Sequence, residues 1–284
     1  MKERGEVRRG SAGAFAGLAM REWRRFARQP TRAVGALGVA ALFWLFVGSG
    51  LSAEVAERGG DAVGAPGDGV VVAPAAVGEI SYAAYLMPGV ALMVIMFAVV
   101  VWSIGLIQDR ASGFLQSALV SPTPMWTVVS AKAGVGGAVA GLQGALILAA
   151  APLVGLTPGV VNVAAAAGVL TAAALGVMAL SLGLAWRSDS VAGFHSVMNV
   201  VLLPLWALSG AVFPLESAAP WLAMVMLLNP LTWANEAAGA LLGARGSAAW
   251  WHVPALLAAV GASFAFALAT MQRSAARTRP GGDG

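Results

Sequence analysis

The residues that could carry chemistry are few, and two carboxylates stand out. Glu216 and Glu236 lie within the stretch from Leu208 to Ala237, which is otherwise mostly apolar and also holds three prolines. An ionisable group in an apolar setting is costly unless it meets a partner or water. The stretch therefore predicts a polar site inside a hydrophobic environment, such as a gate or a proton-coupling site.

Other kinds of chemistry are not indicated. The two histidines, His195 and His252, have no second histidine or carboxylate at metal-ligand spacing. Asp189, near His195, is interpreted as part of a solvated turn. There is no cysteine, and no G-x-x-x-x-G-K-S/T loop to cradle ATP phosphates. We therefore expect no catalytic residues, no metal site, no cofactor bound by this chain and no nucleic-acid partner.

The composition is typical of a helical membrane protein. Of the 284 residues, 59% are hydrophobic and 11% are charged, whereas a soluble domain has about 25% charged residues. Mean hydropathy is +0.80. Long uncharged runs recur along the whole chain, so we expect an all-α protein that crosses the membrane several times.

Six apolar runs are long enough to cross a bilayer at about 20 residues per crossing. They are Val34–Ser52, Leu86–Ile107, Ala133–Gly155, Val161–Ala185, Ser196–Phe213 and Val253–Met271. No Lys, Arg, Asp, Glu or His falls inside them. The sequence thus predicts an N-terminal segment at 1–32, a six-helix membrane domain at 33–271 with an outside loop at 53–82, and a tail at 272–284.

The basic residues predict the orientation of these spans. With six spans, fifteen of the 17 Lys and Arg residues fall on one side, and only Arg58 and Arg245 fall on the other. Basic residues concentrate on the cytoplasmic side of membrane proteins. We therefore expect a multi-pass protein of the inner or plasma membrane with both termini in the cytoplasm.

The segment from Phe15 to Arg32 predicts an amphipathic helix along the inner membrane surface. At 100° per residue, five arginines share one arc, opposite an apolar group. The arginines are Arg21, Arg24, Arg25, Arg28 and Arg32, and the apolar group is Phe15, Ala19, Trp23 and Phe26. Each arginine gains about 1 kcal/mol near anionic lipid. Both an orientation anchor and a lever that touches a cytoplasmic partner are compatible with this pattern.

A second segment, 108–125, connects two spans on the basic side. After Gly113 it places Phe114, Leu115, Ala118 and Leu119 at helical spacing, and Pro122 and Pro124 end the helix. The spacing predicts a short amphipathic helix, which would be either a structural elbow or a docking element.

The third segment, 214–242, predicts a hairpin that enters the membrane from outside. The run from Ala219 to Leu228 is too short to cross, and Asn229-Pro230 would turn the chain back. Irregular backbone survives at membrane depth only when it is buried in protein or lines water. The residues assigned to this hairpin are Pro214, Glu216, Pro220, Asn229, Pro230 and Glu236. An outside loop packed on the lipid surface remains the alternative.

Three motifs in this order resemble the permease subunits of ABC type-2 exporters. They are YLMPGVALM at 85–93, GFLQSALVSPTP at 113–124, and the stretch LSGAVFPLESAAPWLAMVMLLNPLTWANEA at 208–237. The nearest subgroup comprises exporters of drugs, antibiotics and lipo-oligosaccharides. Family coupling helices usually carry acidic residues before the glycine and a basic residue after the prolines. Here Ala111-Ser112 and Met125-Trp126 occupy those positions.

The resemblance implies a division of labour among several chains. The helix from Gly113 to Leu119 would be a coupling helix that docks on an ATPase subunit, beside a connecting helix at Phe15–Gln29. The hairpin would close the exit path as a re-entrant gate. Two permease copies, or two related chains, would form the pathway. ATP and Mg²⁺ would bind the partner ATPase, and the substrate would be an amphipathic or lipophilic drug, antibiotic or lipid-linked glycan.

Other function classes remain as alternatives. A membrane-embedded enzyme would need a nucleophile with a base, and the sequence indicates no such pair. An ion-coupled secondary transporter would have to rely on Glu236, because the predicted spans hold no ionisable group. A binding or scaffold subunit without transport is the third alternative.

Overall fold

The computed structural model describes residues 2–28, 82–113 and 124–277, together with residues 35, 37, 38 and 42. Within these residues every regular element is a helix, and no strand occurs in them. The prediction of an all-α protein is therefore confirmed for this part of the chain. Most of the first predicted span, the outside loop before Tyr82, and Phe114 to Pro122 lie outside the described residues.

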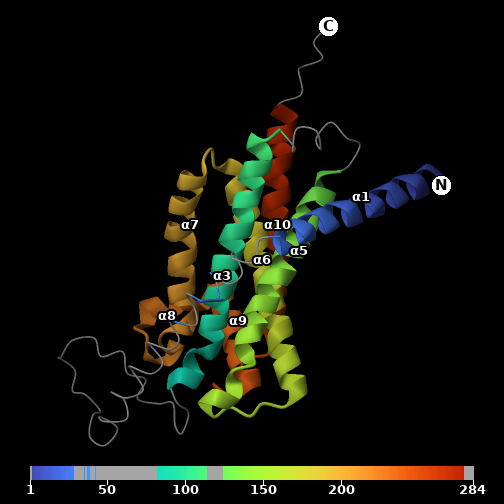
Figure 1. Ribbon diagram of the computed structural model, residues 1–284. Helices are drawn as coiled ribbons and strands as arrows, with labels where there is room; N and C mark the ends of the chain where they lie inside the picture. Colours follow the sequence, from blue (N-terminus) through green and yellow to red (C-terminus); the bar gives the residue numbers. More distant parts are fainter. Residues whose placement is uncertain are drawn as a thin grey trace, which may run out of the picture.

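Five helices of the described part are long and apolar enough to cross a membrane. They are α3 (Tyr82–Ala111), α5 (Met125–Leu148), α6 (Val160–Arg187), α7 (Val191–Trp206) with its π-helical continuation η2 (Ala207–Ala211), and α10 (His252–Arg277). In Figure 1 they form one bundle and alternate in direction. The end of α3, the start of α5 and the end of α10 therefore share one end of the bundle.

Helix α1 (Lys2–Ala27) is longer than predicted and lies across the bundle rather than along it. Its N-terminal half points away from the other helices, and its C-terminal part reaches the bundle beside α3 and α5 (Figure 1). There Phe26 stacks on Trp102 of α3, with ring centroids 5.4 Å apart. The contact fixes the last turns of α1 against the bundle.

Helices α3 and α5 extend beyond the predicted spans at the end of the bundle where they meet α1, and both extensions bring charged residues into helices. Helix α5 begins at Met125 instead of Ala133, so Lys132 lies inside it. Helix α3 continues to Ala111 and includes Asp109. The first four residues of the predicted coupling segment, 108–111, therefore belong to α3, and its last residue, Met125, belongs to α5. Counting apolar residues missed these turns because their charged side chains pair with one another inside the protein.

Helix α5 also ends earlier than predicted, at Leu148, and a short 3₁₀ turn, η1 (Ala151–Val154), follows it. Gly155 closes this turn with φ of +83°, a conformation that other residues rarely adopt. The connection then leads into α6.

Helix α7 breaks where the sequence predicts a disturbed span. Pro204 lies inside the helix, η2 follows, and Gly210 adopts φ of +74°. The chain continues through a 3₁₀ turn, η3 (Leu215–Ser217), and two short helices, α8 (Pro220–Leu227) and α9 (Pro230–Leu242). Both short helices begin with proline, which suits the first helical turn because its missing N–H would have no partner there. Their depth in the membrane stays a prediction.

The bundle is held together by close approach of α5 to α6. A Cβ atom on Gly137 would lie 2.9 Å from the Cα of Leu175, and one on Gly141 would lie 2.8 Å from the Cα of Thr171. These are backbone contacts that no side-chain rotation can relieve. The glycines of α5 therefore set the distance between the two helices.

We predict that Gly137→Ala lowers the stability of the bundle, whereas Gly134→Ala does not. A methyl group at position 137 would force α5 and α6 apart, and overpacking of this kind costs about 1–3 kcal/mol. Gly134 lies on the same helix with nothing within 4 Å of its Cβ position, so alanine there should gain up to about 1 kcal/mol of helix propensity. Thermal unfolding of the purified variants, followed by tryptophan fluorescence, measures both. Equal melting temperatures would contradict the packing argument.

Candidate functional site

Five charged side chains form a cluster where α1 meets α3 and α5; we name it the α1 cluster. Its members are Arg21, Glu22, Arg25, Asp109 and Lys132. The Nζ atom of Lys132 lies at the centre, 2.7 Å from Oε1 of Glu22 and 2.6 Å from Oδ2 of Asp109. One ammonium group on α5 thus joins a carboxylate on α1 to a carboxylate on α3.

Two arginines of α1 complete the α1 cluster. Arg21 donates to Oδ1 of Asp109 over 3.1 Å and to Glu22 over 3.1 Å. Arg25 donates to the same Oδ1 over 3.1 Å and to the amide oxygen of Gln108 over 2.7 Å. Asp109 is therefore shared by three cations from two helices, which saturates its lone pairs.

Burial within the α1 cluster is uneven. The side chains of Glu22, Asp109 and Lys132 are 5%, 4% and 7% exposed, whereas those of Arg21 and Arg25 are 37% and 28% exposed. Three cations face two anions, so the formal charge of the α1 cluster is +1. The accessible part of the α1 cluster is consequently cationic, and its anions are enclosed.

The α1 cluster adds contacts and residues that sequence reasoning missed. Arg21 and Arg25, which were assigned to a face that meets lipid headgroups, both pair with Asp109 of α3, and the contact of this face with lipid stays a prediction. Trp23, assigned to the opposite face, is half-exposed, and Phe15 is also exposed. Glu22, Asp109 and Lys132 were not proposed as site residues. Asp109 and Lys132 lie next to the ends of predicted spans, which was their only signal in the sequence, whereas Glu22 lies inside the predicted amphipathic segment.

A second polar cluster lies at the opposite end of the bundle, around the break in α7; we name it the α9 cluster. The break leaves backbone carbonyls without helical partners, and each such group needs a hydrogen bond when buried. One face of α9 supplies these bonds. Asn229 donates to the oxygen of Leu205 over 2.6 Å, Thr232 to that of Leu208 over 3.1 Å, and Asn235 to that of Ser209 over 2.9 Å.

The next carbonyl, that of Gly210, accepts from two further side chains. Arg245 donates to it over 2.8 Å, and the hydroxyl of Tyr85 on α3 donates over 2.7 Å. Arg245 also pairs with Glu236, and its guanidinium lies 4.1 Å from the centroid of the Tyr85 ring. Glu236 and Arg245 thus complete the α9 cluster. Burial raises the pKa of the Glu236 carboxyl above its ordinary value, and the charge of Arg245 opposes that shift.

The predicted gate residues lie in different surroundings in the structure. Asn229 and Glu236 take part in the α9 cluster, and Asn229 also caps α9 by accepting from the amide of Leu231. Pro220 and Pro230 begin their helices, and Pro214 precedes η3. Glu216 lies exposed on η3. Sequence reasoning missed Thr232, Asn235 and Arg245, although their spacing and the isolation of Arg245 were visible.

No group of three or more His, Cys, Asp or Glu side chains that could hold a metal occurs among residues 2–28, 82–113 and 124–277. His195 is exposed on α7. Asp189 is fully exposed and lies 3.8 Å from Arg110, as expected for a solvated turn. Of the predicted docking residues, Gly113 is described with φ of +75°. Phe114, Leu115, Ala118, Leu119 and Pro122 lie outside the described residues, so their role stays a prediction.

We predict that Lys132→Met destabilises the protein strongly, because it removes the one buried cation of the α1 cluster, which two buried carboxylates share. Removing one partner of a buried ion pair typically costs about 3–5 kcal/mol. Asp189→Asn, which alters an ion pair with a fully exposed carboxylate, should leave the melting temperature unchanged. Adding Glu22→Gln and Asp109→Asn to Lys132→Met should recover part of the loss. Unchanged thermal unfolding of the Lys132 variant would show that the α1 cluster does not hold α1 in place.

Two comparisons with known proteins bear on the family of this chain. A search of the curated proteins finds no match. The profile of the family described as ABC-2 type transporter matches residues 14–242. This match begins within α1 and ends with α9, so it covers the α1 cluster, the α9 cluster except Arg245, and most of the bundle. Membership implies a multi-pass membrane permease that works with an ABC ATPase subunit. The chain belongs to the ABC-2 type transporter family.

Proposed function

We propose that this chain is the permease subunit of an ATP-driven exporter, and that a separate subunit binds ATP and Mg²⁺ and hydrolyses the nucleotide. The observation that carries the proposal is the family match over 14–242. The bundle supports it, because the described residues form a compact helical body with no soluble domain among them. The substrate would be an amphipathic or lipophilic molecule, such as a drug, an antibiotic or a lipid-linked glycan.

The end of the bundle that carries the α1 cluster would face the cytoplasm. Arg110, Lys132 and Arg187 lie at this end, as does the basic α1, whereas Arg245 lies at the other end. This distribution follows the preference of basic residues for the cytoplasmic side. The segment between α3 and α5, which holds Gly113 to Leu119, would then lie where an ATPase subunit can dock.

Force from the ATPase would enter α3 and α5 together. Asp109 lies in the last turn of α3, and Gly113 lies in the turn that follows this helix. Lys132 lies in the second turn of α5. The α1 cluster joins both helices to α1, so a push on the connecting segment would move three helices as a unit. ATPase closure would thereby shift the population toward an outward-open state.

The α9 cluster would be the outer gate. Helix α3 carries Tyr85 at this end, whose hydroxyl bonds to Gly210 in the break of α7. From Tyr85 to Asp109, α3 spans about 36 Å, so the same helix touches both clusters. Movement of α3 would therefore reach the broken segment of α7. A second copy or a related chain would complete the pathway, with lipid around it.

We predict that this chain, purified from mild detergent, brings a P-loop ATPase with it. Phe114→Asp combined with Leu115→Asp should abolish the recovery, because charged side chains would replace the apolar docking edge. Leu153→Asp, at the exposed turn η1 on the opposite end of the bundle, is the matched control and should keep the ATPase. Mass spectrometry of the co-purified proteins gives the readout. Recovery of the chain alone, in several detergents, would favour the carrier alternative.

A secondary transporter driven by Glu236 makes a different prediction. In inside-out vesicles, we expect accumulation of a fluorescent amphipathic dye to require ATP and to survive a protonophore. Glu236→Gln should lower the rate while assembly with the ATPase persists, because the ion pair with Arg245 is lost. Glu216→Gln, on an exposed turn, should have a smaller effect. Transport that a protonophore abolishes and that proceeds without ATP would overturn the exporter.

A further inference from the structure

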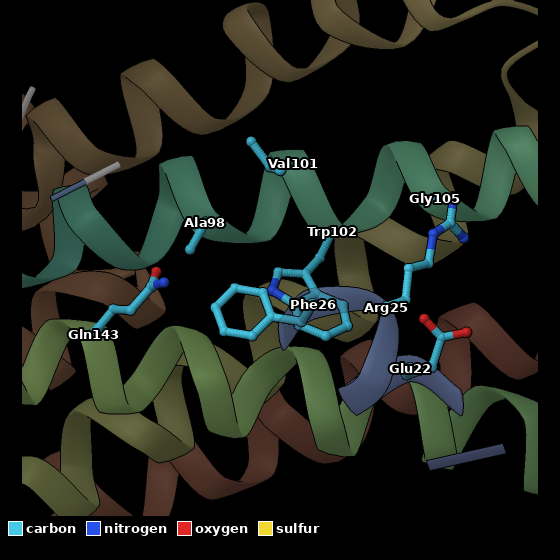
Figure 2. Close-up of a pocket in the computed structure, with 8 residues that line it drawn as sticks. All are labelled: Glu22, Arg25, Phe26, Ala98, Val101, Trp102, Gly105 and Gln143. Atoms are coloured by element: carbon cyan, nitrogen blue, oxygen red, sulfur yellow. The ribbon is translucent and has the colours of Figure 1, made fainter. Parts of the chain in front are cut away.

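A groove between α1, α3 and α5 has the features of a ligand site. Figure 2 shows its walls, which come from Phe26 on α1, Ala98, Val101 and Trp102 on α3, and Gln143 on α5. Its empty space is about 430 Å³ when the open mouth is included. Because this volume includes open solvent at the mouth, the enclosed part of the groove is narrow, so it suits a slender molecule rather than a bulky one.

One end of the groove is cationic. Arg25 and Glu22 line this end, but Glu22 is enclosed and bonded to Lys132, whereas Arg25 keeps 28% of its side chain exposed. Arg21, which belongs to the same cluster, is 37% exposed. A molecule arriving at this end therefore meets guanidinium groups, while the carboxylates are turned inward. An anionic group is the chemistry that fits.

The other end of the groove holds a polar group without a partner. Gln143 is 5% exposed, and its amide oxygen has no hydrogen-bond partner among the residues that the structure describes. Its side chain reaches toward the groove in Figure 2, opposite Ala98. A buried acceptor left unpaired is destabilising, and a single water would need two to four polar partners. The neighbouring walls are the apolar side chains of Ala98 and Val101 and the ring of Trp102, so a ligand N–H or O–H is the better match.

The two polar ends are about 10 Å apart. Gly105 borders the cationic end, since its Cβ position lies 3.4 Å from a guanidinium nitrogen of Arg25. Ala98 borders the other end, and seven residues of helix rise about 10 Å. Between them the groove is lined by Trp102 and Phe26. The groove thus combines an anion site, an aromatic passage and a hydrogen-bond acceptor.

We propose that this groove binds an amphipathic organic anion whose acidic group lies at Arg25 and whose hydroxyl or N–H donates to Gln143. The assignment rests on the proposed function only for its setting, in which the Arg25 end of the groove lies on the cytoplasmic side. Helix α1 supplies both Arg25 and Phe26, so the ligand would contact the helix that the α1 cluster fastens to α3 and α5. A bound ligand would therefore stabilise that attachment.

The test uses the purified full chain in nanodiscs and three probes of equal chain length. These are 8-hydroxyoctanoate, octanoate, which lacks the hydroxyl donor, and 1,8-octanediol, which lacks the anion. An apparent Kd for each comes from the concentration dependence of the melting temperature, read by tryptophan fluorescence. We expect the hydroxy acid to bind roughly fivefold more tightly than octanoate, the factor that a net hydrogen bond of about 1 kcal/mol gives. The diol should bind more weakly than the hydroxy acid.

Gln143→Leu identifies where the hydroxyl binds. This variant replaces an unpartnered buried amide with an apolar group of similar size, so its unliganded melting temperature should be unchanged or higher. The fivefold advantage of the hydroxy acid over octanoate should vanish in it. Gln272→Leu, the same substitution at an exposed position of α10, should keep the advantage.

Several results would overturn the proposal. Equal affinities for the three probes would show non-specific partitioning, and an advantage that survives Gln143→Leu would place the hydroxyl elsewhere. The probe comparison in the unaltered chain decides the first point even if a variant fails to fold. No ATPase is present in the measurement, so its failure would leave the exporter proposal standing, and recovery of an ATPase would not rescue the groove.

Discussion

The structure depends on one buried ammonium group. Lys132 donates to carboxylates on two other helices, over 2.7 Å and 2.6 Å, in surroundings where an unpaired charge would be severely destabilising. The net stability that such a network contributes is small, because desolvation offsets most of the attraction. Its effect is specificity of position: α1 fits against α3 and α5 only where all three charges meet. A helix that crosses the bundle is thereby held in one place.

At the opposite end of the bundle, polar side chains donate hydrogen bonds to buried backbone carbonyls. The break in α7 frees a series of carbonyls, and α9 presents Asn229, Thr232 and Asn235 to them. These side chains recur every three residues, so they form a stripe on one helix face. The polarity of α9 is therefore explained by the backbone of α7. Glu236 holds Arg245, and Arg245 in turn satisfies Gly210, so the carboxylate belongs to the same arrangement.

The sequence was sufficient for the parts of the fold that arise from composition. Apolar runs located the five described spans, and proline placed the turn at Asn229. The break in α7 lies at Ala207–Ala211, inside the predicted fifth span and not at Pro214. The sequence was insufficient where a residue's partner lies far along the chain. Glu22 and Lys132 are 110 positions apart. Glu22 lies within a charged amphipathic segment and Lys132 beside an apolar run, so each resembles an ordinary surface charge. Arg21 and Arg25 were assigned to lipid because helical periodicity identifies a face but not what the face contacts.

Helix α3 connects the two ends of the bundle mechanically. At one end Asp109 belongs to the α1 cluster, and at the other the carbonyl of Gly89 accepts from the indole of Trp206 over 2.8 Å. A Cβ atom on Gly89 would lie 2.5 Å from that of Ala211, so α3 and the broken turn of α7 touch without intervening side chains. Packed helices shift as rigid bodies and do not stretch. A displacement of α3 at the α1 cluster must therefore either move the broken turn with it or separate Trp206 from Gly89.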